Sequence, residues 1–110
     1  MTTRSSRLFV GVVPDGYNVP IFTAGQGVLT LLKSVYGFQQ MTAPNQMVLK
    51  VKPSDAATVA WFYVSTSTDQ VAIQWQGWIV MEPGDQILAD NNGGTVELWG
   101  SGALLPLASQ

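Results

Sequence analysis

The chain has 110 residues, a formal net charge of −2 and a charged fraction of 11%, well below the value of about 25% that is typical of globular domains. This length suits a single domain, and five Lys and Arg residues are too few for the basic surface that nucleic-acid binding needs. The sequence contains no Cys and no His, which excludes disulfides, thiolate chemistry and histidine-based catalysis, so we expect no enzyme activity, no metal and no cofactor.

The first seven residues, 1–7, are polar and cationic, and we expect a flexible N-terminal arm there. Such arms can order against a neighbouring subunit, which makes Arg4 and Arg7 candidate docking residues. The rest of the chain, 8–110, is expected to form one domain. We read no signal peptide at the start and no apolar run long enough to cross a membrane.

After this arm, turn sequences rich in Pro, Gly, Asn and Asp recur along the chain. The runs between them are short and rich in β-branched and aromatic residues, which predicts strands, and no window has convincing helical periodicity. The predicted strands are 8–13, 19–22, 28–38, 47–52, 59–64, 71–75, 77–81, 86–89 and 96–102. Many short strands separated by such turns are typical of a β-sandwich or barrel.

Alternation of apolar and polar residues indicates which side of a strand faces the core. In 47–52, Met47 and Leu49 share the expected buried face, whereas Val48 and Lys50 share the expected solvent face. In 96–102, Val96, Leu98 and Gly100 oppose Glu97, Trp99 and Ser101.

Two tryptophans in 71–81 fall on opposite faces. Trp75 shares its parity with Ile73 and Ile79, whereas Trp78 lies on the other side, unless a bulge at Gly77 resets the alternation. One of the two indoles is therefore expected to be exposed or to lie in an interface, where tryptophan is enriched.

The segment 59–64 breaks the alternation, because it is apolar at every position. An antiparallel sheet in a small domain usually keeps one face in water, so apolar residues on both faces suggest contact with another subunit. A central strand covered by a long loop is the alternative. The interface candidates are Trp61, Phe62, Tyr63 and Trp78.

Two turns contain carboxylates, and a structural role is expected for both. Pro83-Gly84-Asp85 has the order of a type II turn, with Asp85 bonding to nearby backbone groups rather than serving as a ligand or base. The oxygen-rich run 90–94, Asp-Asn-Asn-Gly-Gly, lacks the ligand spacing of a calcium loop and predicts a hairpin tip.

The second half of the chain bears a family resemblance. Its residues are Trp75-Gln76-Gly77-Trp78-Ile79-Val80-Met81-Glu82-Pro83-Gly84-Asp85-Gln86-Ile87 and, after the Gly-rich tip, Val96-Glu97-Leu98-Trp99-Gly100-Ser101-Gly102. Their order and spacing resemble small β-sandwich virion proteins of tailed bacteriophages, and the likeness extends over roughly residues 8–105. It implies a jelly-roll-like subunit that decorates a capsid or forms part of a tail, often as a trimer.

We therefore expect an all-β antiparallel sandwich, jelly-roll-like, with about eight strands. The expected role is a non-enzymatic virion subunit, made in the host cytoplasm, whose partners are itself and other capsid or tail proteins, with no nucleic acid or membrane. Low charge fits this role because burying an amide costs less than burying an ion, although compositional drift would give the same pattern. The alternative is a carbohydrate-binding module built from Trp78 or Trp99 with Gln76, Asn91 and Asn92.

Overall fold

The computed structural model describes residues 4–40, 45–57, 59–67 and 70–107. These residues form eight strands, and the described part of the chain contains no helix, hence none that could cross a membrane. The strands are β1 (Arg4–Val12), β2 (Gly16–Thr23), β3 (Val28–Gln40), β4 (Asn45–Lys52), β5 (Ala60–Ser67), β6 (Gln70–Met81), β7 (Gln86–Asn91) and β8 (Thr95–Pro106).

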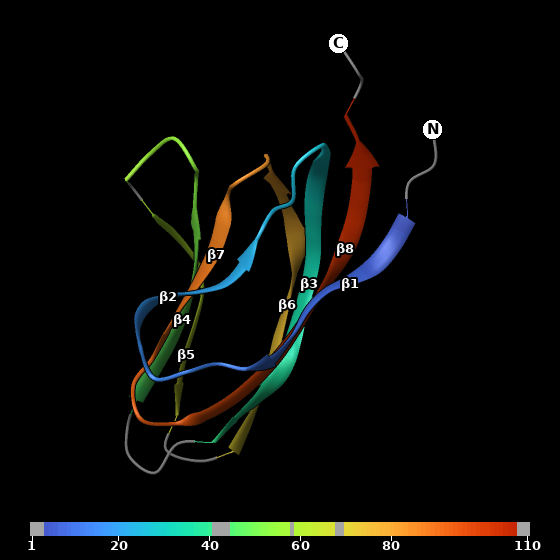
Figure 1. The fold of residues 1–110 in the computed structure, drawn as a ribbon. Coiled ribbons are helices and arrows are strands. Elements are labelled where there is room, and N and C mark those ends of the chain that lie inside the picture. The colour runs from blue at the N-terminus through green and yellow to red at the C-terminus, as the bar shows by residue number, and fades with distance from the viewer. Residues whose placement is uncertain (1–3, 41–44, 58, 68–69, 108–110) are drawn as a thin grey trace.

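The strands form two antiparallel four-stranded sheets that face one another (Figure 1). Sheet A has the order β1-β8-β3-β6, and sheet B has the order β2-β7-β4-β5. Successive strands thus alternate between the sheets for most of the chain, and this order is that of a jelly roll. The expected sandwich is confirmed. The predicted segments 71–75 and 77–81 are one continuous strand, β6, because Gly77 does not interrupt it.

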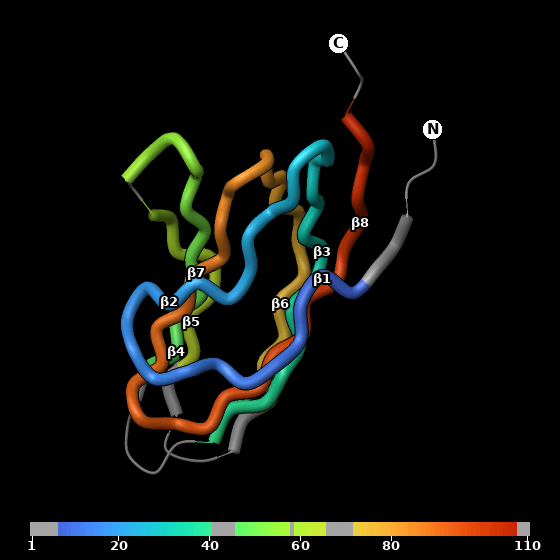
Figure 2. The backbone as a smooth tube through the Cα atoms, viewed as in Figure 1, coloured from blue at the N-terminus to red at the C-terminus, as the bar shows by residue number. Residues whose placement is uncertain are grey.

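The expected flexible arm is wrong for residues 4–7. These residues begin β1 and pair with the end of β8, with Arg4 opposite Leu104 and Arg7 opposite Ser101. Figure 2 shows β1 and β8 running side by side. The polar sequence of residues 4–7 did not indicate a strand. An edge strand is held by backbone hydrogen bonds to its neighbour, and these need no apolar side chains, so such a strand can form without leaving an apolar pattern in the sequence. Residues 1–3 lie outside the described residues.

The core lies between the two sheets and contains the inward-facing residues of the inner strands. The parities expected for 47–52, 71–81 and 96–102 are confirmed on this side, since their inward residues are buried or packed against the core. The largest fully buried apolar side chains are Leu32, Met47, Leu49, Ile73, Met81, Ile87 and Leu98.

Two aromatic pairs fill the open sides of the sandwich. Phe9 of β1 and Phe22 of β2 have ring centroids 5.6 Å apart, and Phe62 of β5 and Trp75 of β6 have centroids 5.0 Å apart at an interplanar angle of 61°. Each pair joins the edge strand of one sheet to the edge strand of the other. The sheets are thus held together at both sides as well as through the central core.

The Pro83-Gly84-Asp85 corner is a structural junction, as expected. Gly84 has a φ of 90°, which its position in the turn requires. The Asp85 carboxylate accepts hydrogen bonds from the backbone N–H groups of Ser54 and Glu82, and the Asp85 carbonyl accepts one from Ala24 N–H. This residue therefore ties the β6–β7 turn to the loops that follow β2 and β4.

The β7–β8 connection is a turn, but it is not the expected hairpin, because β7 lies in sheet B and β8 in sheet A and the two strands do not pair. The Asn91 side chain is 1% exposed and donates hydrogen bonds to the carbonyl oxygens of Val13 and Gly94. Its oxygen accepts a bond from Gly94 N–H. Asn91 therefore fixes the tip from inside the fold and has no free groups for a ligand.

Candidate functional site

The outer face of sheet A carries a group of exposed large apolar side chains. Of the ten large hydrophobic side chains exposed among the described residues, six project from this face. They are Val10 and Val12 of β1, Trp99 of β8, Phe38 of β3, and Trp78 and Val80 of β6. An antiparallel sheet in a small domain usually presents polar residues on the face away from the core, so this surface departs from the common pattern.

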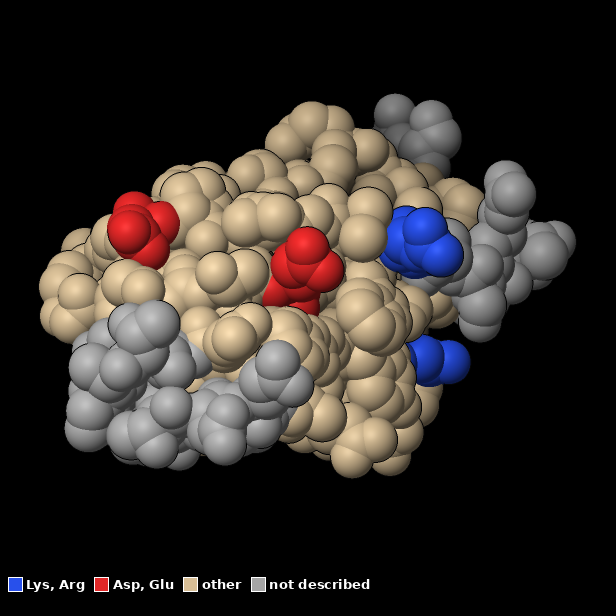
Figure 3. All heavy atoms as spheres, turned by 90° about the horizontal axis from the view of Figure 1, so that it is seen from below, with Lys and Arg blue, Asp and Glu red and all other residues tan. Residues whose placement is uncertain are grey.

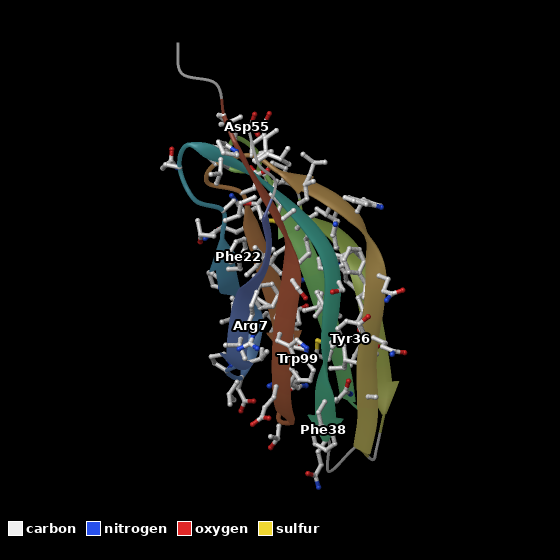
Figure 4. All side chains as sticks on the ribbon, turned by 90° about the vertical axis from the view of Figure 1, so that its right-hand side faces the viewer. Arg7, Phe22, Tyr36, Phe38, Asp55 and Trp99 are labelled. Carbon is white, nitrogen blue, oxygen red and sulfur yellow. The ribbon has the colours of Figure 1, made fainter. Side chains whose placement is uncertain are left out.

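Strand register brings these residues into rows. Val10 lies opposite Trp99, Trp99 opposite Tyr36, and Tyr36 opposite Gln74, so one row crosses all four strands of the sheet. Figure 4 looks onto this face, with Tyr36 and Trp99 on neighbouring strands. Sequence reasoning placed Trp78 and Val80 on one face, but it could not assemble the rows, because the pairing of β1, β3 and β8 links segments far apart in the chain.

Several polar groups on this face interact with neighbours on it. The Gln76 amide donates to the Tyr36 hydroxyl at 2.6 Å, and the hydroxyls of Ser34 and Ser101 lie 3.1 Å apart. The Lys33 ammonium lies 4.9 Å from the centroid of the Trp78 ring, within cation–π distance. Glu97 and Gln74 are also exposed on this face, with Glu97 opposite Val12 and Phe38, so covering the face would require water or a partner group at these two positions.

Charge is sparse elsewhere too. On the end of the sandwich drawn in Figure 3, charged side chains occupy a few isolated positions in an otherwise uncharged surface. A small, dispersed charge adds little to the cost of burying the surrounding surface.

The structure brings the four aromatic interface candidates together at one side of the sandwich. Trp61, Phe62 and Tyr63 lie on β5 and Trp78 lies on β6, and these are the edge strands of the two sheets on that side. The expectation for the tryptophan pair is confirmed, because Trp75 packs against the core whereas Trp78 is 67% exposed. Arg7 is exposed on β1, at the opposite edge of sheet A, and Arg4 begins that strand.

The β5 candidates divide between surface and core. Leu49 pairs with Tyr63 and Lys50 pairs with Trp61, which leaves Phe62 as an extra residue in a bulge. Phe62 and Tyr63 both pack against the core, whereas Trp61 is 58% exposed on the outer face of sheet B. Much of the apolar character of this segment therefore serves the chain's own packing, which the sequence pattern could not show without the bulge.

The outer face of sheet B corrects one expectation. Val48 and Lys50 were expected to face solvent, but they are 2% and 6% exposed. Lys50 forms an ion pair with Asp90 at 2.8 Å, and Asn18 bonds to both partners: its N–H donates to Asp90 and its side-chain oxygen accepts from the Lys50 ammonium. Asn18 has a φ of 54°, and this left-handed conformation accompanies the two bonds.

This ion pair could not be found from the sequence, because Lys50 and Asp90 become neighbours only when β4 pairs with β7. The Trp61 ring lies 5.6 Å from the Lys50 ammonium and contributes to its cover. With Asp90 paired to lysine and Asp85 bonded to backbone N–H groups, neither carboxylate is free to serve a common site.

Two of the hollows on the described part of the sandwich bear on the candidate functions. One, between β1 and β2, is lined by Phe9, Val10, Gly11, Val12, Val13, Pro14, Pro20, Ile21 and Leu98, none of which is titratable. The other is a shallow depression on sheet A, lined by Lys33, Ser34, Tyr36, Gln76, Gly77 and Trp78. The expected contribution of Asn91 to a sugar platform is wrong, since its side chain is buried and fully bonded. Trp99 lies two strands away from Trp78.

Comparison of the chain with protein-family models, curated proteins and solved structures finds no match.

Proposed function

We propose that this protein is a non-enzymatic structural subunit of a tailed-phage virion, and that it acts by associating with itself and with other virion proteins. The observation that supports this most is the outer face of sheet A, where six large hydrophobic side chains are exposed across a four-stranded sheet. A surface of this kind has a physical use when it is removed from water by another protein.

The energetics favour protein contact over solvent exposure. Burial of apolar area contributes roughly 25 cal/mol per Å². Four polar side chains of this face already bond to each other in pairs, Gln76 with Tyr36 and Ser34 with Ser101, which lowers the cost of covering them. Aromatic anchors such as Trp78 and Trp99 are the residues most often found at the energetic centres of interfaces. The face therefore has the composition of a contact surface.

The virion setting rests on the resemblance in residues 75–102 and on the fold. Jelly rolls occur in viral capsid proteins and also in lectins, so the fold alone does not select a function. The order of the Pro-Gly-Asp corner, the Gly-rich tip and the closing strand supports the phage reading. A tail or tail-tip position is preferred slightly over head decoration.

Two measurements test this proposal. Multi-angle light scattering on the purified chain should show a mass greater than the 11.8 kDa of one copy. Mass spectrometry of particles purified from cells carrying the source genome should find the chain in the particles. A monomer that is also absent from particles contradicts the proposal.

A variant with Val10→Thr, Val12→Thr and Trp99→Thr separates the face from the fold. These side chains are exposed, so the melting temperature should change little while incorporation into particles falls. Unchanged incorporation would show that the outer face of sheet A does not mediate assembly into particles. The control is Leu107→Thr, which removes an exposed apolar side chain outside the strands.

The second candidate function is carbohydrate binding on a host surface. The depression on sheet A favours it, because an exposed indole at Trp78 lies beside the Tyr36 hydroxyl and the Gln76 amide, the groups with which proteins stack against and hydrogen-bond to sugars. Titration of Trp fluorescence against a panel of glycans tests it. Saturable quenching that Trp78→Ala abolishes would favour this function, and a flat response to all glycans would remove it.

A further inference from the structure

The long edge strand β6 forms hydrogen bonds along one side alone in the described part of the fold. It is the last strand of sheet A and pairs with β3, so the backbone groups on its other side have no strand partner. Such an edge is a template for another strand, and natural proteins usually block it with charge, proline, bulges or a covering loop. An edge with few of these blocking features is therefore the edge most open to pairing with another strand.

The edges on the β1–β2 side of the sandwich are defended. β1 contains Arg4 and Arg7, and its register shifts between Arg7 and Phe9. β2 contains Pro20, has Asn18 in a left-handed conformation, and shifts register twice against β7. These are the devices that prevent strand addition.

β6 has fewer of these devices. Its twelve residues, QVAIQWQGWIVM, include no charged residue and no proline. Its register against β3 is unbroken from Gln70 opposite Gln40 to Gln76 opposite Ser34, and the shift follows at Gly77 and Trp78, which together face Lys33. Residues 70–76 are thus a regular, uncharged edge of seven residues, which is longer than a typical strand of five or six.

β5, on the same side, is a weaker candidate. It is also uncharged, but it has eight residues, and its bulge at Phe62 leaves 63–67 as the regular part.

We propose that two copies of the chain pair edge to edge through β6, antiparallel about a two-fold axis, to form one continuous eight-stranded sheet. This inference rests on the proposed self-association and adds its partner and geometry. A strand that meets its own copy places like residues near one another across the axis, so charged strands repel and an uncharged strand does not. On the solvent face, the residues of the regular segment that would pair are Ala72, Gln74 and Gln76.

This pairing also accounts for the exposed residues beside the edge. Trp78 and Val80 continue the same face of β6, at 67% and 60% exposure. In the dimer the two outer faces of sheet A would join into one surface, with a Trp78 from each copy flanking the junction. The enlarged face would be the docking surface for the other virion proteins.

A cysteine scan tests the geometry directly, because the natural chain has no cysteine. Single variants Ala72→Cys, Gln74→Cys and Gln76→Cys place a thiol on the β6 edge, and Val10→Cys and Val12→Cys are matched controls on the β1 edge of the same face. Residues facing each other across a two-fold axis have Cβ atoms about 4.5–5.5 Å apart, so a small local movement brings the closest pair to the separation of about 3.5–4.5 Å that a disulfide needs. Mild oxidation should give a cross-linked dimer at one or two adjacent β6 positions and little at β1.

A charge scan provides the second test. Gln74→Lys should weaken the dimer about tenfold or more in sedimentation experiments, because two ammonium groups would meet across the junction. Leu107→Lys, at an exposed position outside the strands and outside the outer face of sheet A, should leave the dissociation constant unchanged. Melting temperatures of both variants check that each chain folds.

The outcomes separate this inference from the proposed function. Cross-linking at β1 instead of β6, or a dimer that survives Gln74→Lys and dissociates in the Val10, Val12 and Trp99 variant, overturns β6 pairing and leaves a structural subunit that associates through its face. A chain that is monomeric at every concentration but present in particles likewise overturns β6 pairing alone. If a strand of a different virion protein fills the edge, β6 cysteines cross-link to that protein and not to themselves, which also overturns it.

Discussion

The rings of Phe62 and Trp75 meet edge to face, with centroids 5.0 Å apart, and join the last strand of sheet B to the last strand of sheet A. One chain neighbour of Phe62, Trp61, projects outward from the same side of the sandwich. Core-packed and exposed aromatic side chains thus lie within a few residues of each other. Single substitutions can therefore measure the contribution of each to the free energy of unfolding.

Trp75→Ala should lower the free energy of unfolding by about 3 kcal/mol, because it removes a large side chain packed against the core. Trp61→Ala should lower it by about 1 kcal/mol or less, because that ring is largely in solvent and its cation–π contact with Lys50 is worth little. Urea denaturation followed by circular dichroism measures both. Equal losses would contradict the assignment of Trp75 to the core and Trp61 to the surface.

The ion pair of Lys50 and Asp90 should show strong coupling. Asp90→Asn keeps an acceptor for Asn18 N–H but leaves a buried ammonium unpaired, so it should cost about 3 kcal/mol or more. Lys50→Met should be costly for the converse reason.

The double variant with both changes should be much more stable than the sum of the single losses, because it removes both charges together. A double-mutant cycle from denaturant titrations measures the coupling free energy. Additive losses would mean that the pair is solvated rather than buried.

Asp85→Asn should destabilise the protein by about 1–3 kcal/mol, because a carboxylate that accepts two backbone N–H bonds is replaced by an amide that accepts at one end. Hydrogen exchange should accelerate at the amides of Ser54 and Glu82. Asp55→Asn, at an exposed position in the loop that follows β4, is the control and should leave exchange unchanged. Unchanged protection in Asp85→Asn would show that the corner is held by other groups.

Gly100→Ala should destabilise the β1–β2 side of the sandwich. An added Cβ would overlap the Phe9 ring, so the ring would have to leave its present position against Phe22. We expect a loss of about 1–3 kcal/mol. Replacing Phe9 with Leu in the same chain should recover part of it, and a loss unaffected by residue 9 would locate the strain elsewhere in the strand.

The sequence was sufficient for the fold class and for much of the inward and outward pattern. Trp75 and Trp78 illustrate why: strand periodicity is local, so their separation of three residues decided that one would be buried and the other exposed. The Pro83-Gly84-Asp85 corner was readable for the same reason, since its geometry depends on adjacent residues.

The sequence was insufficient where an outcome depended on strand pairing. Lys50 was expected to face solvent, but the pairing of β4 with β7 places Asp90 beside it. Arg4 was expected to lie in a flexible arm, but it pairs with β8 as part of a strand. The Phe62 bulge is likewise a property of two strands. The row from Val10 to Gln74 exists because four strands align, and no single segment indicates it.

The position of β1 beside β8 has a mechanical consequence. Arg4 lies opposite Leu104, so the chain enters and leaves sheet A at the same end. Opposing tension on residues 4 and 107 would open this ladder one residue pair after another, as a zipper opens, instead of shearing all its hydrogen bonds at once. In the proposed structural role, load would therefore be carried more securely through the faces and edges of the sandwich than through attachments at these two positions.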